Sequence, residues 1–543
     1  MRILFAGFRR MRLKTIVFSV TLLAALITTF CIVTQYSGGQ SDALETARTH
    51  YNGAISYVGE KLASYGDSAG SDANKEGDTA VKDETTPEGS GKENVQLEES
   101  NMGQHSNSTT GDAKVDEALI HYQESQLTSS EDEIKKLEDS EIEQTSMPFE
   151  DDNLINKLER PLYAISGAEA ANASNALLLE NTEIYKKLLD EPITEPKVGG
   201  LIRENDPVAG KGNATIMALV QNKDVDAIVG TIQQLEEKFN AKFAYPYTLM
   251  NEEYFTDEFK NRITSMLPVD RVVHFAKIDS EDWDVPEDID MKKYKENMNQ
   301  LDRDSVQYAK KISYHNMCRF YSSKFYHQDV LNNYKYVWRI EPNVNFYCDI
   351  DYDIFQFMEE NQKIYGFTLS LYDSPQSVRS LWNVTLGFVK ENPHYLNRNG
   401  AFEWIKENLQ KPENFNMTDG YSTCHFWTNF EIVDLDFLRS EPYEKYMDHL
   451  EKQGGFYYER WGDAPVRSLA LALFADKSQI HWFRDVAYHH FPYTNCPSSP
   501  MGSRRCDGKC TPGVFSAYDN LIVENCLPTW IKYSMSEEQL DMY

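Results

Sequence analysis

Residues 213–250 read NATIMALVQNKDVDAIVGTIQQLEEKFNAKFAYPYTLM, and this stretch decides the fold class. The run Ile216–Val220 is short and fully apolar, as in a buried parallel strand. Tyr245–Met250 predicts a second strand. Between them, apolar residues at spacings of three and four predict a helix: Val225, Ile228, Val229, Ile232, Leu235 and Phe239. Strand, helix and strand in this order form a βαβ unit, which implies an α/β fold with a parallel sheet covered by helices.

A further strand is expected at Tyr334–Ile340, and the pair Glu341 and Pro342 ends it. Ligands of open α/β sheets gather at the carboxyl ends of the strands, so a carboxylate in this place is a candidate ligand. No GxGxxG pattern follows the first strand, and the usual dinucleotide fingerprint is therefore missing.

The chain on either side of this unit is uneven in composition. It has 543 residues with a formal net charge of −31, and residues 61–160 hold 25 acidic and 9 basic residues with only three aromatic ones. Such a segment cannot bury enough apolar surface to offset its ordering entropy. We therefore expect a largely disordered stem over residues 35–212 and one folded catalytic domain over residues 213–543. The acidity argues against a nucleic-acid partner.

The N-terminus has the pattern of a membrane anchor. Residues 15–34 are uncharged, and twenty residues at ~1.5 Å each span the hydrocarbon core of a bilayer. Five basic residues precede the run, so residues 1–14 are expected in the cytosol and the remainder in the lumen, as a type II protein. A cleaved signal peptide is the alternative, but the apolar run is longer than its usual ~7–15-residue core.

Sequons and cysteines agree with a luminal protein. Five Asn-x-Ser/Thr sequons occur, at Asn107, Asn172, Asn213, Asn383 and Asn416. In an oxidising lumen, seven cysteines predict disulfides with one thiol left over: Cys318, Cys348, Cys424, Cys496, Cys506, Cys510 and Cys526. A zinc site formed by the last four is the alternative, although they lack paired CxxC spacing.

Two carboxylate groupings compete for a metal in residues 339–353. Asp349, Asp351 and Asp353 alternate, so in an extended chain they share one face, whereas Glu341 stands alone at a strand end. A nucleotide-sugar transferase needs oxygen ligands that hold a divalent cation against the diphosphate. Spacing alone slightly favours the aspartates, although a solvated acidic face explains them equally well.

Three later segments also carry groups capable of chemistry. Glu431 lies within an aromatic and apolar run, where a bare carboxylate would be costly to bury. Asp463 occupies a turn, and His489 and His490 are adjacent. In an extended chain these histidines face opposite ways, and a structural role is the commoner one for such residues. The residues alone therefore indicate an enzyme without naming its substrate.

Long motifs resemble the fungal Golgi α-1,2-mannosyltransferases, that is, the glycolipid/glycoprotein 2-α-mannosyltransferases of glycosyltransferase family 15. The similarity extends from about Asn213 to the region of Pro497, through residues 339–353, 424–432, 462–465 and 488–497. The resemblance implies a GT-A type Rossmann-like fold with a mixed central sheet. It also implies GDP-mannose as the donor, Mn²⁺ as the cofactor, mannosylated glycoproteins as acceptors and the Golgi membrane as the location.

The resemblance also implies roles for individual residues. It moves the expected metal ligand from the aspartates to Glu341 and adds His490 as the second ligand. Tyr314, Arg339 and Gln221 match segments expected near the donor, with Tyr314 close to its phosphates. Asp463 matches a carboxylate that binds or activates the acceptor hydroxyl. Glu431 matches the proposed nucleophile of a retaining transfer, in which it either attacks the anomeric carbon or only stabilises an oxocarbenium-like transition state.

Three positions depart from the family pattern. Gln221 stands where an arginine is common, Arg467 where a histidine is common, and Ala487 where a glycine is common. None of them removes an expected metal ligand or the expected nucleophile. The leading function is thus a mannosyltransferase extending O-linked or N-linked mannose chains. A catalytically silent glycan-binding or scaffolding relative is the first alternative, and a glycosidase is the second.

Overall fold

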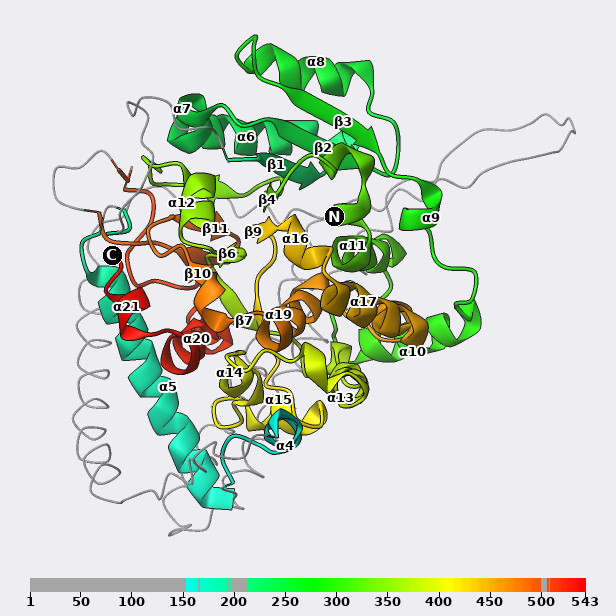
Figure 1. The fold of residues 1–543 in the computed structure, drawn as a ribbon, viewed down its shortest axis with the longest axis vertical. Helices are drawn as coiled ribbons and strands as arrows, with labels where there is room; N and C mark the ends of the chain where they lie inside the picture. The colour runs from blue at the N-terminus through cyan, green and yellow to red at the C-terminus, as the bar shows by residue number, and fades with distance from the viewer. Residues whose placement is uncertain (1–152, 165–166, 194, 198–211, 500–504, 507) are drawn as a thin grey trace, which may run out of the picture. The chain divides into compact units, whose positions relative to one another are not determined.

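The computed structural model describes residues 153–164, 167–193, 195–197, 212–499, 505–506 and 508–543 (Figure 1). The predicted cytosolic tail, the predicted anchor at residues 15–34 and most of the predicted stem lie outside these residues. Within the described part of the chain, no helix combines the length and the apolar character needed to cross a bilayer.

The main sheet has seven strands in the order β10-β6-β9-β4-β1-β2-β3. β4, β1, β2 and β3 are mutually parallel, and β10 is parallel to β6, whereas β9 runs antiparallel to both of its neighbours. The sheet is therefore mixed, as the resemblance implied. Its strands are β1 (Ala214–Leu219), β2 (Tyr247–Asn251), β3 (Val273–Lys277), β4 (Tyr336–Arg339), β6 (Tyr365–Phe367), β9 (Glu431–Asp434) and β10 (Ile480–Trp482).

The predicted βαβ unit is confirmed. β1 pairs in parallel with β2, Ile216 lying opposite Tyr247, and the helix α6 (Val225–Leu235) connects them. Ile228, Ile232 and Leu235 are fully buried, which is the stripe that the spacing predicted. The strand expected at Tyr334–Ile340 is β4, and its four residues are all buried.

Two smaller sheets attach to the main one. β5 (Asn345–Phe346) pairs with β11 (Tyr488–His490), which in turn pairs with β12 (Tyr493–Asn495). This antiparallel sheet brings the histidine pair beside the chain that leaves β4. β7 (Ser370–Tyr372) and β8 (Cys424–Phe426) form the second small sheet.

Helices pack around the sheets, with α6 against α8 over the β1–β3 end and α11, α17 and α19 packed against one another (Figure 1). The helices after α6 are α7 (Ala241–Phe243), α8 (Asp257–Met266), α9 (Ser280–Trp283), α10 (Met291–Arg303), α11 (Ile312–Ser323), α12 (Ile354–Glu360), α13 (Leu381–Glu391), α14 (Phe402–Lys406), α15 (Pro412–Met417), α16 (Leu435–Leu438), α17 (Glu441–Gln453), α18 (Gly455–Tyr458), α19 (Asp463–Phe474), α20 (Leu527–Ser534) and α21 (Glu537–Leu540).

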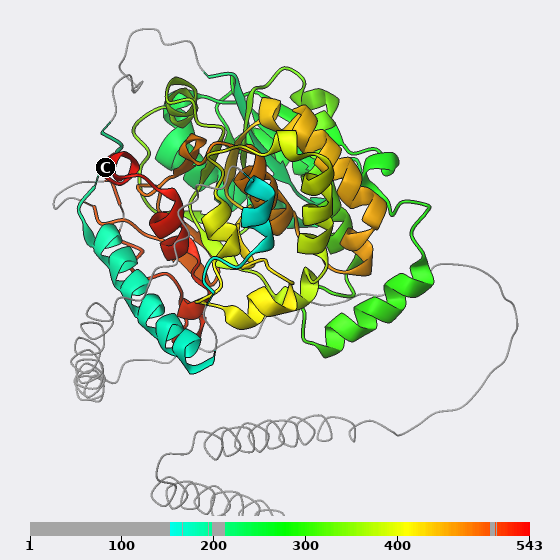
Figure 2. The same cartoon turned by 60° about the horizontal axis from the view of Figure 1, so that its bottom comes forward.

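Packing begins earlier than the predicted boundary at residue 213. The helices α4 (Leu154–Glu159) and α5 (Gly167–Asp190) lie in the range assigned to the stem, yet both pack on the domain (Figure 2). α5 lies against α20 and buries Leu177, Tyr185 and Leu189. The end of the predicted stem is therefore corrected. The low hydrophobicity that predicted the stem is that of residues 61–160, which do not include α5, and the surface that covers α5 comes from the far end of the chain.

Three disulfides tie the distant segments together: Cys348–Cys506, Cys424–Cys526 and Cys496–Cys510. Among the cysteines that the structure describes, Cys318 is the one outside a disulfide, and it is buried. The prediction of disulfides with one thiol left over is confirmed. The alternative zinc site is wrong, since its four cysteines are divided among three different bonds.

Candidate active site

The predicted acids and the second histidine converge at one edge of the main sheet. Arg339 is the last residue of β4 and Glu431 is the first residue of β9, and the two are direct partners in the antiparallel ladder. Partners of this kind project from the same face of a sheet. Because β9 runs antiparallel, its beginning lies at the carboxyl ends of the parallel strands. The edge where ligands of α/β sheets bind therefore carries both side chains.

Arg339 links two of the predicted carboxylates. Its guanidinium is buried, lies 3.4 Å above the Tyr321 ring and donates to Asp463 Oδ2 at 2.6 Å. The other terminal nitrogen donates to Glu341 Oε1. Asp463 also accepts from the Thr428 hydroxyl at 2.7 Å. A planar guanidinium with donors in a fixed fork thus sets the separation of the two acids.

Glu341 and His490 face each other although they are far apart in the sequence. Glu341 Oε2 lies 3.8 Å from His490 Nε2, and both side chains are partly exposed. The backbone of Glu341 is secured from α6, because the Thr231 hydroxyl donates to its carbonyl at 3.1 Å. The His490 ring packs edge-on against Trp427, with the ring centroids 4.6 Å apart.

This pair fits a divalent cation. Ligand atoms at ~2.1 Å from such an ion lie roughly 3–4 Å from one another, and the carboxylate and imidazole are already at that separation. One Glu341 oxygen is engaged by Arg339, which leaves the other for the ion. The described part of the chain contains no cluster of three or more His, Cys, Asp or Glu side chains that could bind a metal ion by itself. A cation at this pair would therefore need further ligands from outside the protein. The partial exposure leaves room for ligands from a bound diphosphate and water.

The three alternating aspartates lie elsewhere and have structural partners. Asp349 pairs with Lys238 at 3.4 Å, and Asp351 pairs with Lys242. Asp353 caps α12 and accepts from the Tyr245 hydroxyl at 2.6 Å. Their side chains therefore form no shared metal site, and the alternation that favoured them has a structural explanation.

Glu431, the expected nucleophile, is only 1% exposed. Its Oε2 lies 3.4 Å from Nε of Arg467, a second buried arginine. Burial raises the pKa of Glu431 above its ordinary value, and the charges of Arg467 and Arg339 pull it back down. The structure therefore places a carboxylate with two nearby cations at the sheet edge.

Two residues expected near the donor have partners of their own. Tyr314, on α11, receives a 3.4 Å hydrogen bond from Arg460 and lies near Asp463, and burial raises its pKa far enough to keep the hydroxyl neutral. Gln221 follows β1 and donates to Glu252 Oε1, which follows β2. Tyr314 therefore lies close to one of the predicted acids, and Gln221 lies at the ends of the neighbouring strands β1 and β2.

Arg460 and Thr428 were not predicted from the sequence. Arg460 is buried and donates to Asp373 at 3.1 Å and to the Ser377 hydroxyl at 3.0 Å, so it orders the chain just before Asp463. A buried arginine three residues before Asp463 leaves no periodic signature in the sequence. Arg467 was noted only as a departure from the family pattern, although its position four residues after Asp463 places it on the same face of a helix.

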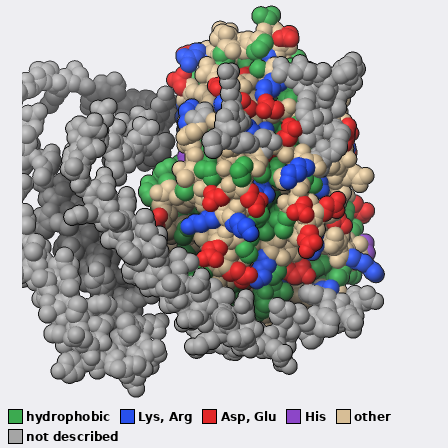
Figure 3. All heavy atoms as spheres, turned by 90° about the vertical axis from the view of Figure 1, so that its left-hand side faces the viewer, with side chains coloured by type: hydrophobic (Ala, Val, Ile, Leu, Met, Phe, Trp, Pro, Cys, Tyr) green, Lys and Arg blue, Asp and Glu red, His purple; other side chains and the backbone are tan. Residues whose placement is uncertain are grey.

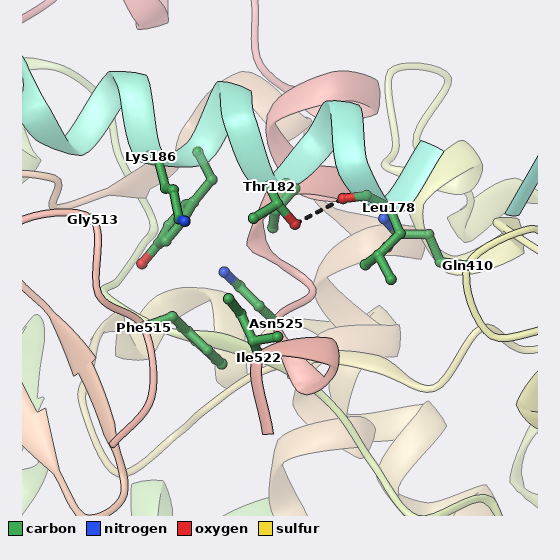
Figure 4. Close-up of a pocket in the computed structure, with 10 residues that line it drawn as sticks. Leu178, Thr182, Lys186, Gln410, Gly513, Phe515, Ile522 and Asn525 are labelled. Atoms are coloured by element: carbon green, nitrogen blue, oxygen red, sulfur yellow. Dashed lines mark hydrogen bonds between the residues drawn. The ribbon is translucent and has the colours of Figure 1, made fainter. Parts of the chain in front are cut away.

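A separate hollow lies away from these carboxylates. It lies between α5 and the C-terminal segment, lined by Thr182, Lys186, Phe515 and Asn525 among others (Figure 4). The described face in Figure 3 carries acidic and basic side chains interspersed with apolar ones. We therefore take the edge of the main sheet as the candidate active site, because the charged side chains converge there.

Residues 175–535 match the family described as glycolipid 2-alpha-mannosyltransferase. The chain belongs to this family. The Saccharomyces cerevisiae protein named probable mannosyltransferase KTR4 is 59% identical over 392 residues, which are 72% of this chain and 84% of that protein.

Two solved structures are also similar to this chain. The S. cerevisiae mannosyltransferase Ktr4p in complex with GDP is 59% identical with a TM-score of 0.70, and the alignment covers 72% of this chain and 98% of that one. Core-mannan synthase A of Aspergillus fumigatus, in its Mn/GDP form, is 44% identical with a TM-score of 0.61, over 64% and 93% of the two chains. These likenesses establish an α/β glycosyltransferase fold.

Proposed function

We propose that this chain is a retaining mannosyltransferase that moves mannose from GDP-α-D-mannose to a mannose hydroxyl of O-linked or N-linked glycans, forming α-1,2 linkages. The observation that carries the proposal is the Glu341–His490 pair, joined through Arg339 to Asp463 at the carboxyl edge of the sheet. Membership of the family and the GDP in a relative 59% identical support the choice of donor.

Glu341 and His490 are the residues proposed to hold Mn²⁺, which the Mn/GDP form of a 44% identical relative supports. When bound, the ion would neutralise charge on the diphosphate leaving group. Tyr314, Arg339 and Gln221 are the residues proposed to contact the donor. A neutral Tyr314 hydroxyl can donate to a phosphate oxygen without repelling it.

Asp463 is the group proposed to receive the acceptor hydroxyl. It is held by Arg339 and Thr428 at the start of α19, where the helix dipole favours a negative charge. A fixed carboxylate of this kind orients the attacking hydroxyl and accepts its proton. Retention requires attack from the face that the leaving group departs from, or a double displacement through Glu431. The burial of Glu431 against Arg467 supports the route in which it stabilises positive charge on the sugar.

A single assay tests the proposal. The purified full-length protein is incubated with GDP-mannose, Mn²⁺ and methyl α-mannoside, and the products are separated by chromatography. We expect an α-1,2-linked disaccharide, and EDTA should abolish its formation. Glycan binding without turnover would support the silent relative, and release of free mannose from a glycan without nucleotide would support a glycosidase.

We also propose that residues 1–14 are cytosolic, that residues 15–34 anchor the protein in the Golgi membrane, and that a stem carries the catalytic domain in the lumen. The three disulfides support an oxidising compartment. Protease protection in intact vesicles tests this orientation. The domain should survive protease until detergent is added, and digestion without detergent would contradict the proposal.

A further inference from the structure

Arg467 is a completely buried arginine directly behind Glu431. Its Nε lies 3.4 Å from Glu431 Oε2, and both side chains are 1% exposed. Burying a cation and an anion is costly unless the geometry compensates for the lost hydration. A pair at this depth, on the face where the other predicted site residues gather, therefore needs an explanation.

The far end of Arg467 is fixed by two further groups. Its terminal nitrogens donate to the Tyr443 hydroxyl of α17 and to the Tyr321 carbonyl of α11, the latter at 2.7 Å. The guanidinium also lies over the Phe325 ring, 5.5 Å from the centroid. With α11 and α17 both holding it, the arginine has one orientation, and that orientation presents Nε to Glu431.

Two arginines and two acids follow one another with alternating sign. Asp463 and Arg467 are four residues apart on α19 and thus share a helix face. Asp463 accepts a hydrogen bond from Arg339. Arg339 lies opposite Glu431 in the strand ladder, and the Glu431 carboxylate lies beside the Arg467 guanidinium. The titratable or charged groups facing Glu431 are Arg467 and Asp463 from α19, Arg339 from β4, Tyr365 from β6 and Tyr443 from α17.

We propose that Arg467 is the positioning residue for Glu431, acting from the side away from the substrate to hold the carboxylate as an anion in one orientation. The inference rests on the proposed function and adds a residue to its machinery. Arg467 would not contact donor or acceptor. It would act through Glu431 on the positive charge that develops on the transferred sugar.

A purely structural role predicts a different outcome from a positioning role. Burial raises the pKa of Glu431, and the Arg467 charge opposes that rise. Loss of the charge should raise the pKa further, so Glu431 would need a higher pH to ionise. The acidic limb of the kcat–pH profile would then move to higher pH. A packing defect alone would lower activity without moving that limb.

The test compares Arg467→Met, which keeps an unbranched apolar stem and removes the charged guanidinium, with Arg467→Lys, which keeps a charge. For Arg467→Met we expect kcat to fall about 10- to 100-fold, the range for loss of an orienting partner. The KM for GDP-mannose should change less than about threefold, because the arginine lies behind the site. The acidic limb should rise by about one pH unit, and Arg467→Lys should restore its position.

Arg319→Met is the matched control. Arg319 is also buried and pairs with an acid, Glu451, at 3.1 Å, but it belongs to none of the groups placed at the site. The Arg319→Met variant should have a lower midpoint of thermal unfolding, while the acidic limb of its kcat–pH profile should stay in place. An Arg467→Met variant with an unmoved limb and no rescue by lysine would behave like this control and would overturn the inference.

A comparison of Glu431→Gln with the double variant Glu431→Gln/Arg467→Met gives a second test, which does not need Arg467→Met alone to fold. The double variant has no buried acid left unpaired, and its kcat should equal that of Glu431→Gln alone. A further loss of kcat in the folded double variant would show that the arginine acts independently of Glu431, and the inference would fall. Absence of transfer by the unmodified protein would instead overturn the proposed function.

Discussion

Glu341 and the aspartates 349–353 are carboxylates within a dozen residues of one another, yet they differ in every structural respect. Glu341 follows the carboxyl end of a buried parallel strand and faces His490, which lies on β11 of the neighbouring small sheet. Asp349 and Asp351 pair with lysines, and Asp353 caps a helix. The carboxylates of Asp349 and Asp351 are neutralised by adjacent lysines, and that of Asp353 accepts hydrogen bonds from the first turn of α12. Glu341, in contrast, has one carboxylate oxygen that faces the imidazole of His490.

The comparison teaches that alternation is a weaker sign of a metal site than the position of a strand end. Alternating aspartates share a face only if the chain stays extended. Here each of the three aspartates has a different partner, because Asp349 and Asp351 pair with separate lysines and Asp353 caps α12. A strand end needs no such condition, because the sheet itself brings distant segments to the same edge.

The largest expected effect is that of Glu341→Ala. This variant should lose at least about 100-fold of Mn²⁺-dependent transfer, because one of only two protein ligands in the pair disappears. Initial rates across a Mn²⁺ titration measure the loss, and circular dichroism confirms folding. The matched control is Asp351→Ala, which should retain near-normal rates. If folded Glu341→Ala and folded Asp351→Ala lost the same amount of Mn²⁺-dependent transfer, Glu341 would not be distinguished from the aspartates as a metal ligand.

Glu431→Gln comes next. Removal of a negative charge next to the developing oxocarbenium ion should lower kcat by about 100- to 1,000-fold, as for other groups that stabilise transition-state charge. GDP affinity, followed by calorimetry in the presence of Mn²⁺, should stay within a few-fold of the unmodified value. Near-normal turnover would exclude both the nucleophilic and the stabilising role.

Arg339→Lys tests the link between the two acids. A lysine cannot donate to Glu341 and Asp463 in the fixed geometry of a guanidinium, so we expect transfer to fall about 10- to 100-fold, with a higher Mn²⁺ concentration at half-maximal rate. Arg262→Lys serves as the control, since Arg262 pairs with Asp226 on the surface. An unchanged Mn²⁺ requirement would mean that Arg339 does not orient Glu341.

The smallest effect on activity is expected for Asp353→Ala. The variant loses a helix cap and the hydrogen bond from Tyr245, so the free energy of unfolding should fall by about 1–2 kcal/mol, while kcat stays within about twofold. Urea denaturation measures the first quantity and the transfer assay the second. A large loss of activity at unchanged stability would return Asp353 to the list of metal ligands.

The sequence predicted much of the frame of the molecule. The apolar run at Ile216 and the stripe from Val225 to Phe239 predicted the βαβ unit, and the motif at residues 339–342 predicted where a strand would end. These predictions succeeded because strand and helix periodicities are local. The start of the packed region failed for the opposite reason, since α5 is covered by α20, which follows it by more than 300 residues.

By itself, the sequence determined the α/β class, the oxidised cysteines and, through its long motifs, the family. Only the tertiary structure decided that Glu341 meets His490, that Arg339 joins two acids and that Arg467 lies behind Glu431. Apart from the bond between Arg339 and Glu341, each of these contacts joins residues that are far apart in the sequence. Which side chains meet at a sheet edge depends on the order of the strands and on their register. The periodicity of a single segment predicts its secondary structure but not its neighbours in the sheet.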